Sequence, residues 1–243
     1  MNDTPGNLPS WIEEALKLSK VKEDEKVSLV STHLYDKEYF DAFMIALDNL
    51  GADCVRVILP PRSVGEGGTL HYRGGPVAPL GSPIGPFAMD IYKESDMILI
   101  PLPRFDEPYD GVIESVPCAI PEYTEEWYEI LKSGTRMLLF QLPEAISRRM
   151  FPTPDLIKRS LAGVKLMEEA KEIRVKSESG TDLTLSKKGR PGHVQIGVAD
   201  VPGRWDNFGF GCVACGPIED SANGTLVIEP PAAISPLQRF VEE

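Results

Sequence analysis

One stretch near the start of the chain places two short segments rich in β-branched residues on either side of an amphipathic segment. Few folds accommodate that order. The flanking segments are KVSLVST (26–32) and DCVRVIL (53–59). Between them, residues 36–50 carry apolar side chains at helical spacing, and Gly51 follows where a helix C-terminus favours glycine. A strand, a helix and a strand of these lengths predict a βαβ unit with parallel strands and a right-handed crossover.

The alternation of strands and helices continues to about residue 170. Further strands are expected at 97–102 and 135–141, and further helices at 85–93, 124–132 and 154–170. Thr153 and Pro154 are typical of a helix start, as the cap and the first helical residue. Ser10 and Glu13 have the spacing of a capping box, which predicts a helix beginning at Ser10, before the first strand.

The pattern changes after residue 171. Segments 172–177 and 182–186 alternate around Gly180 and predict a hairpin, and further strands are expected at 194–198 and 225–229, with Asn223-Gly224 as a turn. The expected fold class is therefore α/β. A doubly wound, mostly parallel, Rossmann-like sheet over residues 1–170 precedes a smaller, partial, β-rich domain over residues 171–243.

Charge and composition exclude several classes of partner. The 243 residues carry a net charge of −12 without a basic cluster, which disfavours binding to nucleic acid or to an anionic membrane. No apolar run is long enough to span a bilayer, and residues 1–9 do not have the apolar core of a signal peptide. Four cysteines are too few for a disulfide framework, so the expected location is the reducing cytoplasm.

The sequence offers little for a metal or redox site. The three histidines, His33, His71 and His193, are not spaced as a helical ligand pair. Cys212 and Cys215 form a C-x-x-C in a strand-like stretch, and the alternative to a redox or zinc role is that they are two small packed thiols. Among the histidines, His71 lies in a glycine-rich stretch of the loop at 60–86 and is a candidate ligand-binding residue.

The richest polar stretch is ADVPGRWD, residues 199–206. Arg204 could clamp a carboxylate, Trp205 could stack on a planar ring, and Asp206 completes a candidate substrate-binding set. The alternative is a turn that contains an internal Asp–Arg pair and a packed tryptophan. The sequence alone leaves both interpretations open.

The stretch A-D-x-P-G-R-W-D, followed by E-D-S-A-x-G-T-L-V from Glu219, resembles the 2,5-dihydroxypyridine 5,6-dioxygenases and their relatives, the aminopeptidase T metallopeptidases (leucyl aminopeptidase, M29-like). LKLSKV (16–21), ILKSGTR (130–136) and RVKS (174–177) extend the resemblance. It covers nearly the whole chain and corresponds to the amino-terminal two-thirds of the family's proteins.

The resemblance implies a ring-opening dioxygenase that uses one Fe(II), bound by two histidines and a carboxylate. In the family those ligands lie beyond the position of Glu243, so none is carried over, and we expect another chain or segment to supply the metal. The family's catalytic and pocket positions fall at Tyr123, Gln195 and Asn207. Tyrosine is a poor base at neutral pH, and glutamine and asparagine do not titrate.

Three functions are consistent with these residues. The chain is a dioxygenase component acting on a small hydroxylated N-heterocycle or aromatic ring, a non-catalytic partner subunit of a complete paralogue, or a relative of the aminopeptidase T metallopeptidases. A β-rich domain of about 70 residues is marginally stable alone, so it packs heavily on the first domain, is completed by another chain, or belongs to a fragment. We expect a homo- or hetero-oligomer.

We predict that the purified chain alone holds no stoichiometric iron. The measurement is metal analysis by mass spectrometry after anaerobic loading with Fe(II) and desalting. A tightly bound, equimolar iron would refute the expectation that the ligands lie elsewhere.

Overall fold

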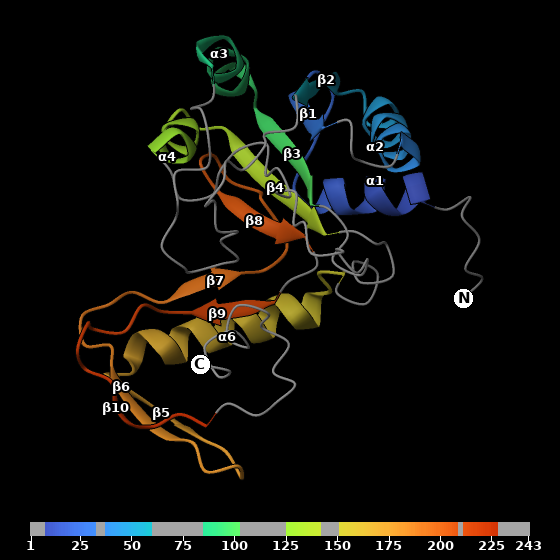
Figure 1. The fold of residues 1–243 in the computed structure, drawn as a ribbon. Helices are drawn as coiled ribbons and strands as arrows, with labels where there is room; N and C mark the ends of the chain where they lie inside the picture. The colour runs from blue at the N-terminus through green and yellow to red at the C-terminus, as the bar shows by residue number, and fades with distance from the viewer. Residues whose placement is uncertain are drawn as a thin grey trace, which may run out of the picture. The chain divides into compact units, whose positions relative to one another are not determined.

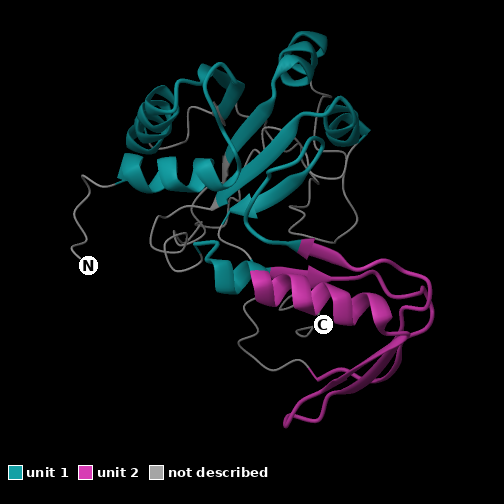
Figure 2. Cartoon of the chain, turned by 180° about the vertical axis from the view of Figure 1, so that it is seen from behind, with its two compact units in different colours: residues 1–157, 195–211 teal, residues 158–194, 212–243 magenta. Residues whose placement is uncertain are grey.

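A computed structural model describes residues 8–32, 37–59, 85–102, 125–141, 151–208 and 211–227. The chain divides into two compact units (Figure 2). The larger unit contains residues 1–157 and 195–211, and the smaller unit contains residues 158–194 and 212–243. The expected boundary at residue 170 does not coincide with this division, because the chain returns to the larger unit after residue 194.

The larger unit is built on a five-stranded sheet in the order β2-β1-β3-β4-β8 (Figure 1). All its neighbouring strands are parallel, as in the register that sets Val27 opposite both Cys54 and Met97. The expected parallel α/β sheet is confirmed. The strands are β1 (Lys26–Thr32), β2 (Asp53–Leu59), β3 (Met97–Leu102), β4 (Arg136–Gln141) and β8 (Trp205–Phe208).

Helices cover both faces of this sheet, as expected for a doubly wound fold. The helices are α1 (Leu8–Leu18), α2 (Lys37–Asn49), α3 (Pro86–Glu94) and α4 (Glu125–Lys132). The apolar residues of α1 and α2 form one buried cluster with Leu29 and Phe140 of the sheet. Those of α3 and α4 form a second cluster with Ile100 and Leu139. The strands are therefore buried on both faces, which explains their nearly continuous apolar sequences.

Two helix ends illustrate how local sequence sets the boundaries. After α2, Gly51 has φ +72 and donates to the carbonyl of Asp48, while Ala52 donates to that of Leu47, which is the Schellman pattern expected there. By contrast, α1 begins at Leu8, so Ser10 lies inside the first turn and the predicted start at Ser10 is wrong.

The fifth strand, β8, was not expected from the sequence. Its four residues, WDNF, include two polar side chains that are disfavoured in strands. The turn that precedes β8 requires glycine at position 203. Gly203 has φ +69, and a Cβ added to it would lie 2.7 Å from the Leu131 carbonyl oxygen. Residues 205–208 thus extend the larger sheet, rather than the predicted β-rich domain.

The smaller unit contains two antiparallel sheets and most of a long helix. One sheet has the order β10-β6-β5, and the other pairs β7 with β9. The expected hairpin around Gly180, which has φ +105, is confirmed as β5 and β6. The elements are α6 (Pro154–Glu169), β5 (Glu172–Lys176), β6 (Asp182–Ser186), β7 (His193–Gln195), β9 (Cys212–Ala214) and β10 (Asn223–Thr225).

Of two local predictions for this part of the chain, a helix cap at Thr153 and a turn at Asn223-Gly224, only the first agrees with the structure. Thr153 accepts a hydrogen bond from the Leu156 amide at 3.2 Å, so the predicted cap of α6 is confirmed. The predicted turn at Asn223-Gly224 is wrong, because both residues lie in β10. Gly224 is required there by close approach, since a Cβ on it would lie 2.0 Å from the Asp182 carbonyl oxygen.

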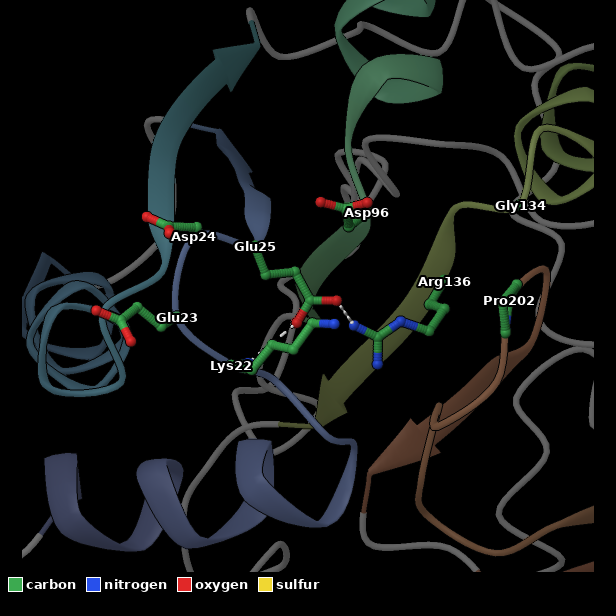
Figure 3. Close-up of a pocket in the computed structure, with 8 residues that line it drawn as sticks. All are labelled: Lys22, Glu23, Asp24, Glu25, Asp96, Gly134, Arg136 and Pro202. Carbon is green, nitrogen blue, oxygen red and sulfur yellow. Dashed lines mark hydrogen bonds and ion pairs between the residues drawn. The ribbon is translucent and has the colours of Figure 1, made fainter.

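A buried arginine joins three distant segments of the larger unit. The Arg136 side chain is 7% exposed and forms an ion pair with Glu25, which is 8% exposed (Figure 3). Its guanidinium also donates to the carbonyls of Ser19 and, at 2.9 Å, Ala199. The Ala199 amide returns a hydrogen bond to the Ser19 hydroxyl at 3.2 Å. Arg136 therefore connects the end of α1, the start of β1 and the segment before β8.

We predict that Arg136→Met lowers the free energy of unfolding by about 3–5 kcal/mol, because it leaves the Glu25 carboxylate buried without a cation. Urea denaturation at pH 7 measures the change. Arg174→Met is the matched control. Arg174 pairs with Asp182 at 2.8 Å, but both side chains are about half exposed, so its loss should hardly move the midpoint. Equal losses in the two variants would contradict the assigned role of Arg136.

Candidate functional site

The topology of the larger sheet points to its carboxyl edge. From β1 the chain moves to β2 on one side, and then to β3 and β4 on the other, so the winding reverses between β1 and β3. In open α/β sheets, ligands bind outside the carboxyl ends of the strands at such a switch point. The segments that follow the five parallel strands lie outside the described residues. Two of the candidate residues, His71 and Tyr123, are in those segments, and so is His33.

Of the expected substrate-binding residues, Asp206 lies in the interior of the larger unit. Its side chain is 0% exposed and accepts hydrogen bonds from the amides of Ile196 at 3.0 Å and Gly197 at 3.1 Å. The backbone amide of the next residue, Asn207, donates a third hydrogen bond to this carboxylate at 2.8 Å. The carboxylate thus ties residues 195–197 to β8. Burial raises the pKa of Asp206, while the Ile196 and Gly197 amides and then Arg204 act in the opposite direction.

Arg204 and Trp205 are engaged within the protein. The Arg204 guanidinium lies 3.1 Å from an oxygen of Asp206 and 3.8 Å from one of Asp200. The Trp205 ring meets the ring of Trp127 edge to face, with centroids 5.5 Å apart. The structure therefore shows the alternative that the sequence had left open, an internal Asp–Arg pair beside a packed tryptophan.

Asn207 and Gln195 are the two candidate residues with buried side-chain amides, 1% and 7% exposed. Asn207 is opposite Leu139 in β4, toward the carboxyl end of β8. Its Oδ1 atom is buried and has no hydrogen-bond partner among the described residues. A buried carbonyl oxygen without a donor is costly, so a donor on a ligand would stabilise this position.

A pocket of about 510 Å³ opens at the opposite, amino edge of the sheet (Figure 3). Several of its polar groups already have partners within the protein. Glu25 points toward Arg136 and accepts from the Lys22 amide at 3.2 Å, and Asp96 accepts from the Lys26 amide at 2.9 Å. The pocket therefore exposes part of the Arg136 network, and it lies away from the edge where α/β sheets hold their ligands.

The described residues contain no group of three or more His, Cys, Asp or Glu side chains that could hold a metal ion. Cys212 and Cys215 are free and half-buried; Cys212 is the first residue of β9 and Cys215 follows its last residue. Cys54 is also free, and burial raises the pKa of its thiol to about 11, so it is a packed thiol at neutral pH. Nor does any described helix have the length and apolar character needed to cross a membrane.

Sequence reasoning missed the role of the ILKSGTR motif. The Thr135 hydroxyl lies within hydrogen-bond distance of two carbonyl oxygens, that of Tyr92 in α3 at 3.0 Å and that of Ser95 just after α3 at 2.8 Å. Arg136 forms the buried network described above. The available signal was a charged residue at the start of an otherwise apolar strand, which requires a buried partner.

Comparison with known proteins gives a consistent result. A family model described as NicX, 2,5-dihydroxypyridine 5,6-dioxygenase, matches residues 7–243. The chain is 31% identical over 240 residues to a 2,5-dihydroxypyridine 5,6-dioxygenase of Pseudomonas putida, covering 97% of this chain and 62% of that protein. The solved structure of 2,5-dihydroxypyridine dioxygenase from P. putida KT2440 superposes with a TM-score of 0.74 at 29% identity. It covers 93% of this chain and 60% of the other.

We predict that Arg204→Met lowers the free energy of unfolding at pH 7 by about 1–3 kcal/mol, since it removes the cation beside a buried carboxylate. The pKa of Asp206 then rises further. A raised pKa in the folded state means that stability is lost as the pH increases through the window between the ordinary and the raised value. The loss should therefore shrink toward pH 4, as urea denaturation across pH can show.

Two further variants separate the partners of Arg204. In an Asp206→Asn background, the cost of Arg204→Met should fall, because the buried charge is gone. Asp200→Asn, which removes the more distant partner, should cost less than Arg204→Met. A pH-independent loss in Arg204→Met would argue against coupling to Asp206.

Proposed function

The chain belongs to the 2,5-dihydroxypyridine 5,6-dioxygenase (NicX) family, and from this membership we propose that it serves the ring opening of a small hydroxylated N-heterocycle or aromatic ring by dioxygen. The family match over residues 7–243 carries the proposal. The substrate class and the reaction come from the name of the relative, of which this chain spans 62% of the length.

The family name implies iron, but the described residues do not fit an iron site. They contain no group of three ligating side chains, and His193 is the one histidine among them. We therefore propose that the iron ligands lie outside the described residues. When bound, iron would supply the activation of dioxygen.

The contribution of this chain is to bind and orient the ring. Asn207 offers a buried acceptor oxygen without a hydrogen-bond partner among the described residues, and a ring hydroxyl, or the N–H of the pyridone tautomer of a 2-hydroxypyridine, is a donor that would satisfy it. Gln195 is held close to β8, because the next two residues, Ile196 and Gly197, donate their backbone amides to the Asp206 carboxylate. Asp206 and Arg204 thus act as positioning residues, since their polar groups are engaged with each other.

Tyr123 and His71 complete the proposed set from segments outside the described residues. With an unperturbed pKa near 10, a tyrosine at position 123 would donate a hydrogen bond to the ligand rather than remove its proton. Ring opening in this chain would then depend on a base other than the side chains at positions 123, 195 and 207.

The lack of an effective base at positions 123, 195 and 207 favours a second candidate function. The chain would be a non-catalytic subunit that binds the same ligand class and pairs with a complete family member. The expected relation to the aminopeptidase T metallopeptidases stays a prediction, as do the cytoplasmic location and the need for a partner chain.

We predict that the chain binds 2,5-dihydroxypyridine under anaerobic conditions and that Asn207→Leu weakens binding about tenfold, the cost of one buried hydrogen bond. Isothermal titration calorimetry measures both affinities. Unsubstituted pyridine is the matched ligand control, and its weaker binding should not change with the substitution. Equal binding of the two ligands by the unmodified chain would contradict the proposed site.

Oxygen uptake distinguishes the two candidate functions. A dioxygenase component should consume one dioxygen per ring opened when Fe(II) and a complete family member are supplied, above the rate of that family member alone. A non-catalytic subunit should bind the ring without adding to the uptake.

A further inference from the structure

Among the described residues of the smaller unit, no strand pairs with the outer side of β5. In the order β10-β6-β5, this strand is at the edge of its sheet. Of its five residues only Ile173 is half-buried, and the apolar side chain of Val175 is 43% exposed. An open edge strand presents unpaired backbone groups and can pair with another strand.

The backbone of β5 determines which residues can form that pairing. Beyond its two ends, Lys187 donates to the Lys171 carbonyl at 2.9 Å and Ser177 donates to the Thr181 carbonyl at 3.0 Å. Because backbone direction alternates along an antiparallel strand, the odd-numbered residues 171–177 turn their N–H and C=O groups toward β6. Glu172, Arg174 and Lys176 therefore turn theirs toward the open edge.

The side chains of these three residues form an ordered row of charges on one face of the sheet. Glu172 is negative and Lys176 is positive, and Arg174 lies between them. The Arg174 guanidinium is held by both oxygens of Asp182, at 2.9 and 2.8 Å, while the Lys176 ammonium lies 3.4 Å from one of them, so Asp182 compensates chiefly the charge of Arg174. Ile173 and Val175 lie on the opposite face, beside Leu185 and Leu183 of β6.

We propose that β5 pairs antiparallel with β5 of a second copy of this chain, across a two-fold axis centred on Arg174. Each outward-facing N–H then meets a carbonyl of the other strand, because the centre is a residue whose backbone faces the edge. Glu172 lies opposite Lys176 of the second copy at both ends of the pairing. On the other face Ile173 lies opposite Val175 of the second copy, and the apolar rows of the two sheets become continuous.

The charge order distinguishes this register from its competitors. Parallel pairing in register would set each charge beside its own kind. An antiparallel shift to a centre on Glu172 or Lys176 would bring two like charges together at the axis and leave the other end unpaired. Like charges directly opposite one another destabilise a strand pair, and opposite charges stabilise it.

The association is expected to be reversible. One pair of five-residue strands covers less surface than a standard, stable interface, so the dimer should depend on protein concentration. The ion pairs between Glu172 and Lys176 would be solvent-exposed, so added salt should weaken it.

Charge exchange between two variants tests the pairing directly. Glu172→Lys and Lys176→Glu each set like charges opposite one another in a homodimer, and each should raise the dimer dissociation constant on the order of tenfold. An equimolar mixture of the two restores opposite charges at both ends and should restore association. Sedimentation velocity over a range of concentrations, with one variant labelled, measures the dissociation constants of the two homodimers and of the mixed dimer. Circular dichroism confirms that each variant is folded.

Lys188→Glu is the matched control, since it makes the same charge change at an exposed position of the smaller unit outside β5 and should leave association unchanged. The proposal is overturned if the unmodified chain stays monomeric at several hundred micromolar, which would assign the open edge to a different partner. It is also overturned if folded single variants associate like the unmodified chain, or if mixing them restores nothing.

Discussion

A buried guanidinium needs acceptors and a counter-charge, and Glu25 supplies the counter-charge of Arg136 through an ion pair between segments 111 residues apart in the sequence. Ser19 and Ala199 supply carbonyl oxygens to the same group, and each lies in a stretch by which the chain resembles its family. Those stretches therefore describe the scaffold at the amino edge of the sheet. The ligand-binding residues of the family are expected at the opposite edge, so the scaffold can be shared while the pocket residues differ.

The elements that were predictable are those with a local physical cause. The βαβ unit followed from the spacing of apolar residues, the end of α2 from Gly51, and the start of α6 from the Thr153 hydroxyl. The strand β8 was not predictable, because its polar residues are satisfied by partners that only the folded chain brings near. Asp206 tolerates burial through the amides of Ile196 and Gly197, and no feature of the sequence around residue 206 reveals them.

The candidate site, too, was only partly predictable from the sequence. The sequence marks residues 199–206 as its richest polar stretch, but it could not decide between a ligand clamp and an internal ion pair. That choice depends on the direction of the Arg204 side chain, which is fixed by Asp206 and Asp200. Asn207 differs from its neighbours in having a buried oxygen that no described group satisfies, and this could be recognised only from its packing.

The place of β8 in the chain also affects biosynthesis. A growing polypeptide that has emerged as far as residue 170 carries β1 to β4, but the strand that pairs with β4 follows only after the hairpin of β5 and β6. Until then β4 has an open edge, and Arg136 is without the Ala199 carbonyl. Completion of the first sheet must wait for translation of a later segment, so the order of synthesis and the order of folding differ in this protein.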